Sequence, residues 1–204
     1  MKNQILTMLS LQDQMNTKVN QDWRSKNFEW YRAIWTECAE LMDHYGWKWW
    51  KNQKPDVEQS KLELVDIWHF GLSILLAGES DVHKISDSII VRWHDSSSGK
   101  AFREALEDFT LATLSTKGFD MEKFCTLLAC IDMSFEELYK TYVGKNVLNM
   151  FRQDHGYKDG TYKKVWAGRE DNEHLVDVVA QVDVNHVDYQ ILLYQGLSVR
   201  YQKA

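Results

Sequence analysis

Four carboxylates recur at helical spacing in two neighbouring segments of the sequence. Glu37 and Glu40 are three residues apart in ECAE, and Glu63 and Asp66 are three apart in ELVD. Side chains three positions apart share one face of a helix, so each segment is expected to present two carboxylates side by side. Apolar residues border each pair, which favours a position at the edge of a buried face. The pattern predicts two acidic pairs that a helical hairpin brings together.

Four carboxylates in one place repel one another strongly at the low effective dielectric of a protein interior. A hard divalent cation offsets that repulsion, and oxygen donors suit Mg²⁺ or Mn²⁺. Mg²⁺ also keeps water molecules and takes substrate phosphates as ligands. The alternative is that each pair belongs to an ordinary solvated helix face. Two pairs on consecutive helices, each beside apolar residues, favour the metal site.

The elements that must position these acids are helices. The chain of 204 residues has one proline, and proline breaks helix interiors, so long uninterrupted helices are expected. Apolar periodicity and glycine or polar breaks predict helices at about 2–18, 28–44, 57–77, 81–93, 100–115, 120–131, 134–153, 170–181 and 186–202. The last segment also has some strand character in VDYQILLY. The sequence therefore predicts an all-α protein.

Composition limits the partners and the location of the protein. Hydrophobic residues make up 44% and charged residues 26%, as in a soluble globular protein. The net charge of −6 argues against nucleic acid as a partner. The three cysteines form no CxxC pair and are expected to be free thiols. We find no signal peptide and no apolar run long enough to span a membrane, so we expect a cytoplasmic protein.

A short basic segment stands out in this acidic chain. Arg152, Lys158, Lys163 and Lys164 fall within the polar, glycine-containing stretch RQDHGYKDGTYKK. Arginine and lysine side chains bind polyphosphates together with metal ions. The segment therefore predicts a loop that closes over a phosphate-bearing substrate.

Three blocks, taken together, resemble the dimeric all-α dUTPases of the MazG-like pyrophosphatase superfamily. They are LSLQDQMN; the run ECAEL, WKWWK and ELVDIWHF; and YKTYVGKNVLNMFRQDHGYKDGTYKKVWAGREDNEHL, which spans residues 139–175. The resemblance implies a helical bundle of the MazG-like NTP pyrophosphatase type in a single domain, residues 1–204. Its core would comprise 1–78 and 134–180, with a variable helical region at about 80–133.

The resemblance also implies roles for individual residues. The metal ligands would be Glu37, Glu40, Glu63 and Asp66. The amides of Gln12 and Asn16 would read the uracil edge, because an amide offers both a donor and an acceptor. Aromatic walls of the base pocket would come from Phe70 and Trp47, with Trp49 or Trp50. The sugar and phosphates would be held by Lys145, Asn149, Arg152, Tyr157 and Lys163.

Several of these residues have simpler explanations. Gln12 and Asn16 alone would be surface amides, Phe70 alone would be core, and the tryptophans would serve packing or dimer contacts. His69 is interpreted as a satisfied core histidine. Thr36 stands where many MazG-like proteins have a glutamate before the first metal ligand. A base from that position is therefore excluded, and we expect the metals to activate a water that Glu37 or Glu40 orients.

The resulting hypothesis is a dUTP diphosphatase that hydrolyses dUTP, and also dUDP, to dUMP with two or more Mg²⁺ ions. The resemblance also implies a homodimer. A first alternative keeps the fold but changes the base: a dCTPase–dUTPase or a broader house-cleaning dNTP pyrophosphatase, since an amide can rotate to suit cytosine. A second alternative is a non-catalytic helical module whose acidic face binds partners.

Overall fold

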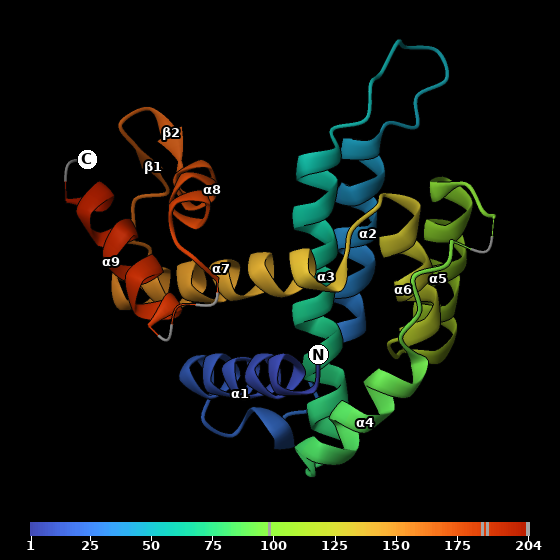
Figure 1. Cartoon of the computed structure of the whole chain (residues 1–204), viewed down its shortest axis with the longest axis horizontal. Coiled ribbons are helices and arrows are strands. Elements are labelled where there is room, and N and C mark those ends of the chain that lie inside the picture. Colours follow the sequence, from blue (N-terminus) through green and yellow to red (C-terminus); the bar gives the residue numbers. More distant parts are fainter. Residues whose placement is uncertain (98, 185, 187, 203–204) are drawn as a thin grey trace. The chain divides into compact units, whose positions relative to one another are not determined.

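The computed structural model describes residues 1–97, 99–184, 186 and 188–202, and it is mostly helical (Figure 1). Its helices are α1 (Lys2–Val19), the 3-10 helix Trp23–Ser25, α2 (Trp30–Tyr45), α3 (Val57–Gly78), α4 (Val82–Arg92), α5 (Phe102–Thr116), α6 (Met121–Cys130), α7 (Phe135–Asp154), α8 (Asp171–Gln181) and α9 (Tyr189–Tyr201). A short antiparallel hairpin joins β1 (Val165–Trp166) to β2 (Arg169–Glu170). The predicted all-α fold is confirmed.

Aspartates at helix starts explain why several predicted boundaries fall close to the observed ones. Asp56 accepts from Gln59 N at 3.2 Å at the start of α3, and Asp81 and Asp120 cap α4 and α6 in the same way. Such caps satisfy backbone N–H groups that lack a partner within the helix. The strand character suggested for VDYQILLY is wrong from Tyr189 onward, where α9 begins. Val187 lies outside the described residues.

The chain divides into two compact units, Met1–Leu138 and Tyr139–Ala204, which we describe separately. Helix α7 begins in the first unit and continues into the second. The expectation of a single domain with a variable middle region stays a prediction.

The α2–α3 hairpin is the centre of the first unit, and Figure 1 shows the two helices running side by side in opposite directions. The interior of α3 is apolar, and its Trp68 is fully buried and stacks on Phe124 of α6 with ring centroids 5.4 Å apart. Gly71 lets α3 approach Phe119, because a Cβ at that position would lie 2.7 Å from the ring. The apolar inner face of α3 fixes its rotation and therefore the direction of its acidic residues.

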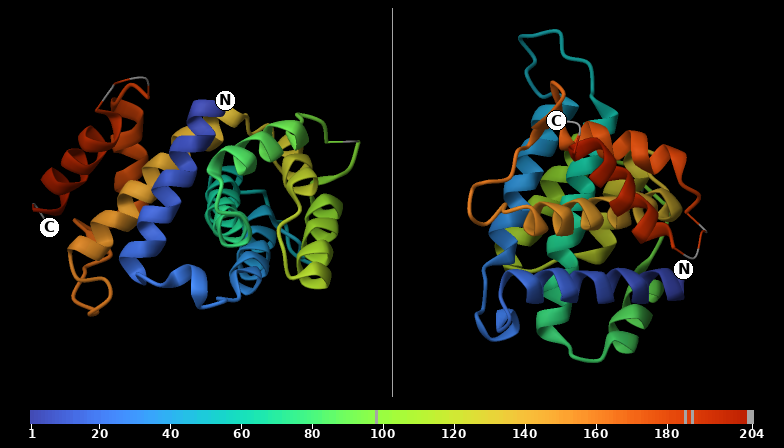
Figure 2. Two further views of the ribbon diagram at one scale, coloured as in Figure 1. Left: turned by 90° about the horizontal axis from the view of Figure 1, so that it is seen from below. Right: turned by 90° about the vertical axis from the view of Figure 1, so that its left-hand side faces the viewer.

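Helix α1 packs across α3 and α4 in the first unit, as the views in Figure 2 show. Its apolar residues Ile5, Met8 and Leu9 are fully buried. One and two turns further along, the polar residues Gln12 and Asn16 are also buried. The buried face of α1 is therefore apolar from Ile5 to Leu9 and polar at Gln12 and Asn16.

Aromatic side chains form the core of the second unit. The ring of Phe151 on α7 lies 5.7 Å from that of Trp166 and 5.4 Å from that of Tyr201. A capping box between Glu170 and Glu173 starts α8 immediately after the hairpin. Among the residues described, every helix is too short or too polar to traverse a lipid bilayer.

Candidate active site

The α2–α3 hairpin brings three of the four predicted carboxylates together. One oxygen each from Glu37, Glu63 and Asp66 lies within 4.8 Å of the other two. Glu63 is only 9% exposed, and the other two are half-buried. Glu40 is exposed on α2, one turn beyond Glu37, and is not part of this trio. We call Glu37, Glu63 and Asp66 the carboxylate trio.

The trio is electrostatically unfavourable without a counter-charge. Burial, together with the charges of Asp66, Glu63 and Glu40, raises the pKa of Glu37 to about 8. Glu40 is therefore close enough to act on the trio despite its exposure. Three oxygens at this separation fit a hard divalent cation, whose oxygen ligands lie 2.0–2.6 Å from the metal. The donor set is thus chemically suited to Mg²⁺ or Mn²⁺.

A histidine that the sequence analysis missed adjoins the trio. His44 Nε2 lies 3.4 Å from Glu63 Oε1, at the last turn of α2. It follows Glu40 by four residues and Glu37 by seven, so helical spacing alone places it on the same face. This spacing was the available signal. The contact supports one oxygen of Glu63 from outside the trio.

The predicted base-reading amides are buried between α1 and α3. Gln12 is 4% exposed and Asn16 is 6% exposed, so neither is a surface amide. Both amides contact Ser73 Oγ, a residue that the sequence analysis did not single out. His69 is also buried, and its Nδ1 lies 2.8 Å from Gln12 Oε1. It was interpreted as a core histidine, and its ring directly supports a predicted substrate-binding residue.

Phe70 is half-buried and stacks on Trp30, with ring centroids 6.2 Å apart and an interplanar angle of 29°. Trp30 was missed, although it lies seven residues before Glu37 on the same helix. Trp47, the predicted partner of Phe70, lies in the loop between α2 and α3 (Figure 1). Its indole donates to Asp43 at 3.1 Å and meets Trp50 edge to face. The structure thus pairs Phe70 with Trp30, and the pocket role of Trp47 stays a prediction.

In the second unit, Arg152 is held by a buried carboxylate. Its Nε and Nη2 donate to the two oxygens of Asp171 at 2.8 Å each, and its Nη1 donates to Asn149 Oδ1 at 3.1 Å. The hydroxyl of Tyr162 also donates to Asp171, at 2.8 Å. Asp171 is fully buried. This carboxylate was missed because its partner lies 19 residues away along the chain.

The other predicted phosphate-binding residues differ in exposure. Lys145 is buried, whereas Tyr157 and Lys163 are exposed. Gly156 and Gly160 adopt positive φ angles of 87° and 71° in the turns that follow α7, a backbone conformation that favours glycine. Whether these residues meet the carboxylate trio stays a prediction.

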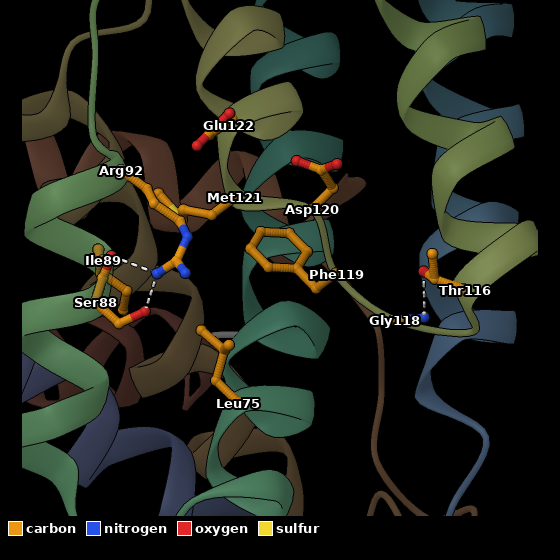
Figure 3. A pocket seen from close by; sticks show the side chains of 10 residues that line it. All are labelled: Leu75, Ser88, Ile89, Arg92, Thr116, Gly118, Phe119, Asp120, Met121 and Glu122. Carbon is orange, nitrogen blue, oxygen red and sulfur yellow. Dashed lines mark hydrogen bonds between the residues drawn. The ribbon is translucent and has the colours of Figure 1, made fainter.

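A separate cavity of about 560 Å³ lies between α4, the end of α3 and the start of α6 (Figure 3). The Arg92 guanidinium points into it and is held by the carbonyl and hydroxyl of Ser88. The ring of Phe119 forms part of the wall, and Asp120 and Glu122 lie at its edge. The residues that line this cavity include none of the predicted site residues.

The first of two comparisons finds a match across most of the chain. A family model described as dUTPase matches residues 4–157. The match covers α1 to α7, and therefore the amides of α1, the carboxylate trio and Arg152. A comparison with curated proteins finds no match.

Proposed function

This chain belongs to the dUTPase family, and we propose that it hydrolyses dUTP, and also dUDP, to dUMP at the carboxylate trio. The family supports a hydrolase with a dUTPase-type activity on a nucleotide substrate. The observation that carries the finer proposal is the approach of three carboxylate oxygens to within 4.8 Å of one another on the α2–α3 hairpin. In a chain of the dUTPase family, three carboxylate oxygens this close together support a metal-dependent reaction at the carboxylate trio.

The trio, completed by Glu40, is proposed to hold two or more Mg²⁺ ions. When bound, the ions lower the pKa of a water molecule and neutralise charge on the phosphates. Glu37 or Glu40 would accept a hydrogen bond from the attacking water and fix its direction. Glu40 suits this task because it is exposed while its charge still acts on Glu37. His44 would keep Glu63 in place through its contact with Oε1.

Substrate recognition is proposed to use two groups of residues. Gln12 and Asn16 would read the uracil edge, and the stacked pair of Phe70 and Trp30 would pack on the base, with Trp47 covering it. The sugar and phosphates would be held by Lys145, Asn149, Arg152, Tyr157 and Lys163.

The exposed side chains of Trp35, Leu111 and Leu114 support a homodimer, for which sedimentation should give twice the chain mass. We propose that the dimer acts in the cytoplasm.

The test is pyrophosphate release from dUTP, dCTP, dTTP and UTP, with and without Mg²⁺. Asp66→Asn and Glu40→Gln should each reduce dUTP turnover at least about 100-fold, since each removes charge from the metal site. Glu58→Gln is the matched control, because Glu58 is an exposed glutamate in the first turn of the same helix as Asp66. Rates near wild type in Asp66→Asn would remove the carboxylate trio as the active site.

A further inference from the structure

A buried hydrogen-bond network joins the two amides of α1 to one serine of α3. Gln12 Nε2 donates to Ser73 Oγ at 3.0 Å, and Asn16 Nδ2 donates to the same oxygen at 2.9 Å. Gln12 Nε2 also donates to Asn16 Oδ1 at 3.0 Å. These side chains are at most 6% exposed, so bulk water does not compete for the bonds.

The bonding capacity of Ser73 decides which way each amide faces. A hydroxyl has one hydrogen to donate and two lone pairs. Ser73 donates its hydrogen to the carbonyl oxygen of His69 at 3.0 Å, so its lone pairs must receive N–H groups. A rotated Gln12 amide would place Oε1 against the oxygens of Ser73 and Asn16, and a rotated Asn16 amide would place Oδ1 against Ser73. Ser73, together with the His69 Nδ1 that lies 2.8 Å from Gln12 Oε1, therefore holds both amides in one orientation.

We infer that Ser73 is a specificity-determining residue, which positions the amide pair to select uracil over cytosine. The inference rests on the proposed function, because it requires that Gln12 and Asn16 meet the base. In the fixed orientation, Gln12 Nε2 directs its two hydrogens to Asn16 and Ser73, so Gln12 meets a ligand through its oxygen, which has two lone pairs and also lies 2.8 Å from His69 Nδ1. Asn16 Nδ2 directs one hydrogen to Ser73 and keeps the other as a donor.

Uracil matches this arrangement of one acceptor beside one donor. Its N3–H donates to the Gln12 oxygen, while its O4 accepts from Asn16. Cytosine in the same position presents an acceptor at N3 and a donor at its amino group, so both contacts become repulsive. Cytosine satisfies the pair only by turning its ring over, with its amino group at the Gln12 oxygen and N3 at Asn16, which displaces the sugar and phosphates. Without Ser73, both amides can rotate together once the His69 ring changes tautomer, so that its Nδ1 accepts from Gln12, and the pair then accepts cytosine.

The experiment compares kcat/KM for dUTP and dCTP in wild type, Ser73→Ala and Ser73→Cys. Losing one hydrogen-bond acceptor should lower the dUTP-to-dCTP ratio about tenfold or more in Ser73→Ala, mainly because dCTP turnover rises. Ser73→Cys nearly keeps the side-chain volume but is a weak acceptor, so it should shift the ratio in the same direction while preserving packing.

Ser60→Ala is the matched control. Ser60 lies on the same helix, is fully buried and donates to a backbone carbonyl four residues earlier, that of Asp56 at 2.7 Å. Its removal should leave the ratio unchanged. A second readout is thermal unfolding with the product dUMP or with dCMP. The greater stabilisation by dUMP should shrink in both Ser73 variants and persist in Ser60→Ala.

The outcomes separate this inference from the proposed function. A wild-type protein that hydrolyses neither nucleotide removes the proposed function. A wild-type protein that prefers dUTP, with both Ser73 variants retaining the full ratio, overturns the role of Ser73 alone. A wild-type protein that accepts dCTP as readily as dUTP also overturns it and leaves a pyrophosphatase of broader base choice.

Discussion

The carboxylate trio places like charges close together in a partly buried position. Burial and three neighbouring carboxylates raise the pKa of Glu37, so each ionised partner lowers the stability of the metal-free protein. With a pKa of about 8, Glu37 is largely protonated in the fold at pH 7, and this protonation costs folding free energy because the unfolded carboxyl ionises at about pH 4. Glu37→Gln removes this cost at nearly constant shape. In the presence of a chelator, the variant should therefore unfold at a higher temperature than wild type. Added Mg²⁺ should then raise the melting temperature of wild type more than that of the variant.

Thermal unfolding with EDTA and with Mg²⁺ measures both effects, and Glu58→Gln controls for the loss of any glutamate from the hairpin. A lower melting temperature of Glu37→Gln in EDTA would show that Glu37 stabilises the fold by itself. That result would count against a trio built to hold a cation.

The pair of Arg152 and Asp171 makes a contrasting case, because each charge is compensated. Burial opposes ionisation of Asp171, but the hydrogen bonds and charge of Arg152, with the Tyr162 hydroxyl, outweigh burial and lower its pKa. An acid with a lowered pKa stabilises the folded state above its unfolded value of about 3.9. That stability is lost as the pH falls through the lower folded value. We therefore expect acid unfolding of the second unit below about pH 4.

Asp171→Asn should destabilise the protein by about 3–5 kcal/mol at neutral pH, since it leaves Arg152 buried without its counter-charge. The variant should also lose part of the acid dependence. Asp177 is the matched control, because it lies on the same helix α8 and pairs with Arg169 and Arg200 at the surface. Asp177→Asn should change stability little, because surface ion pairs contribute weakly. Urea unfolding at pH 7 and pH 4 measures these differences.

Helix α3 packs closely against the Phe119 ring because Gly71 has no side chain. Gly71→Ala would set a methyl group 2.7 Å from the Phe119 ring, so we expect a loss of about 1–3 kcal/mol despite the better helix propensity of alanine. Gly78, the last residue of the same helix, has nothing within 4 Å of the equivalent position. Gly78→Ala should be neutral or stabilise by up to about 1 kcal/mol. Equal effects of the two substitutions would contradict the packing explanation.

The helices could be predicted from the sequence because their signals are local. Aspartate caps, the glycine after α2 and apolar periodicity all lie within or beside each helix, so the observed bounds fall near the predicted ones. The β1–β2 hairpin was missed because strands of two residues have no periodicity. Ser73 and Trp30 were missed for another reason. Their partners Gln12 and Phe70 lie far away along the chain, and only tertiary packing brings them together.

Substrate binding is proposed to involve the acidic residues of α3 and the basic segment at residues 149–164. If each segment holds part of the nucleotide, Mg²⁺ with a non-hydrolysable dUTP analogue should slow amide hydrogen exchange in α3 and also in residues 149–164. The helix α9 is the internal control, because none of its residues is proposed to touch substrate. Protection confined to α3 would contradict the proposed role of Arg152 and its neighbours in binding phosphates.

The loop between α2 and α3 carries the most exposed indoles among the described residues. Trp49 is 90% exposed and Trp50 is 58% exposed, whereas Trp68 and Trp166 are fully buried. Indole emission moves to longer wavelength in water, so the loop contributes the red edge of the intrinsic fluorescence. Anything that covers the loop, whether nucleotide or second subunit, shifts that edge toward the blue. The protein thereby carries an optical reporter of binding at this loop, with no attached dye.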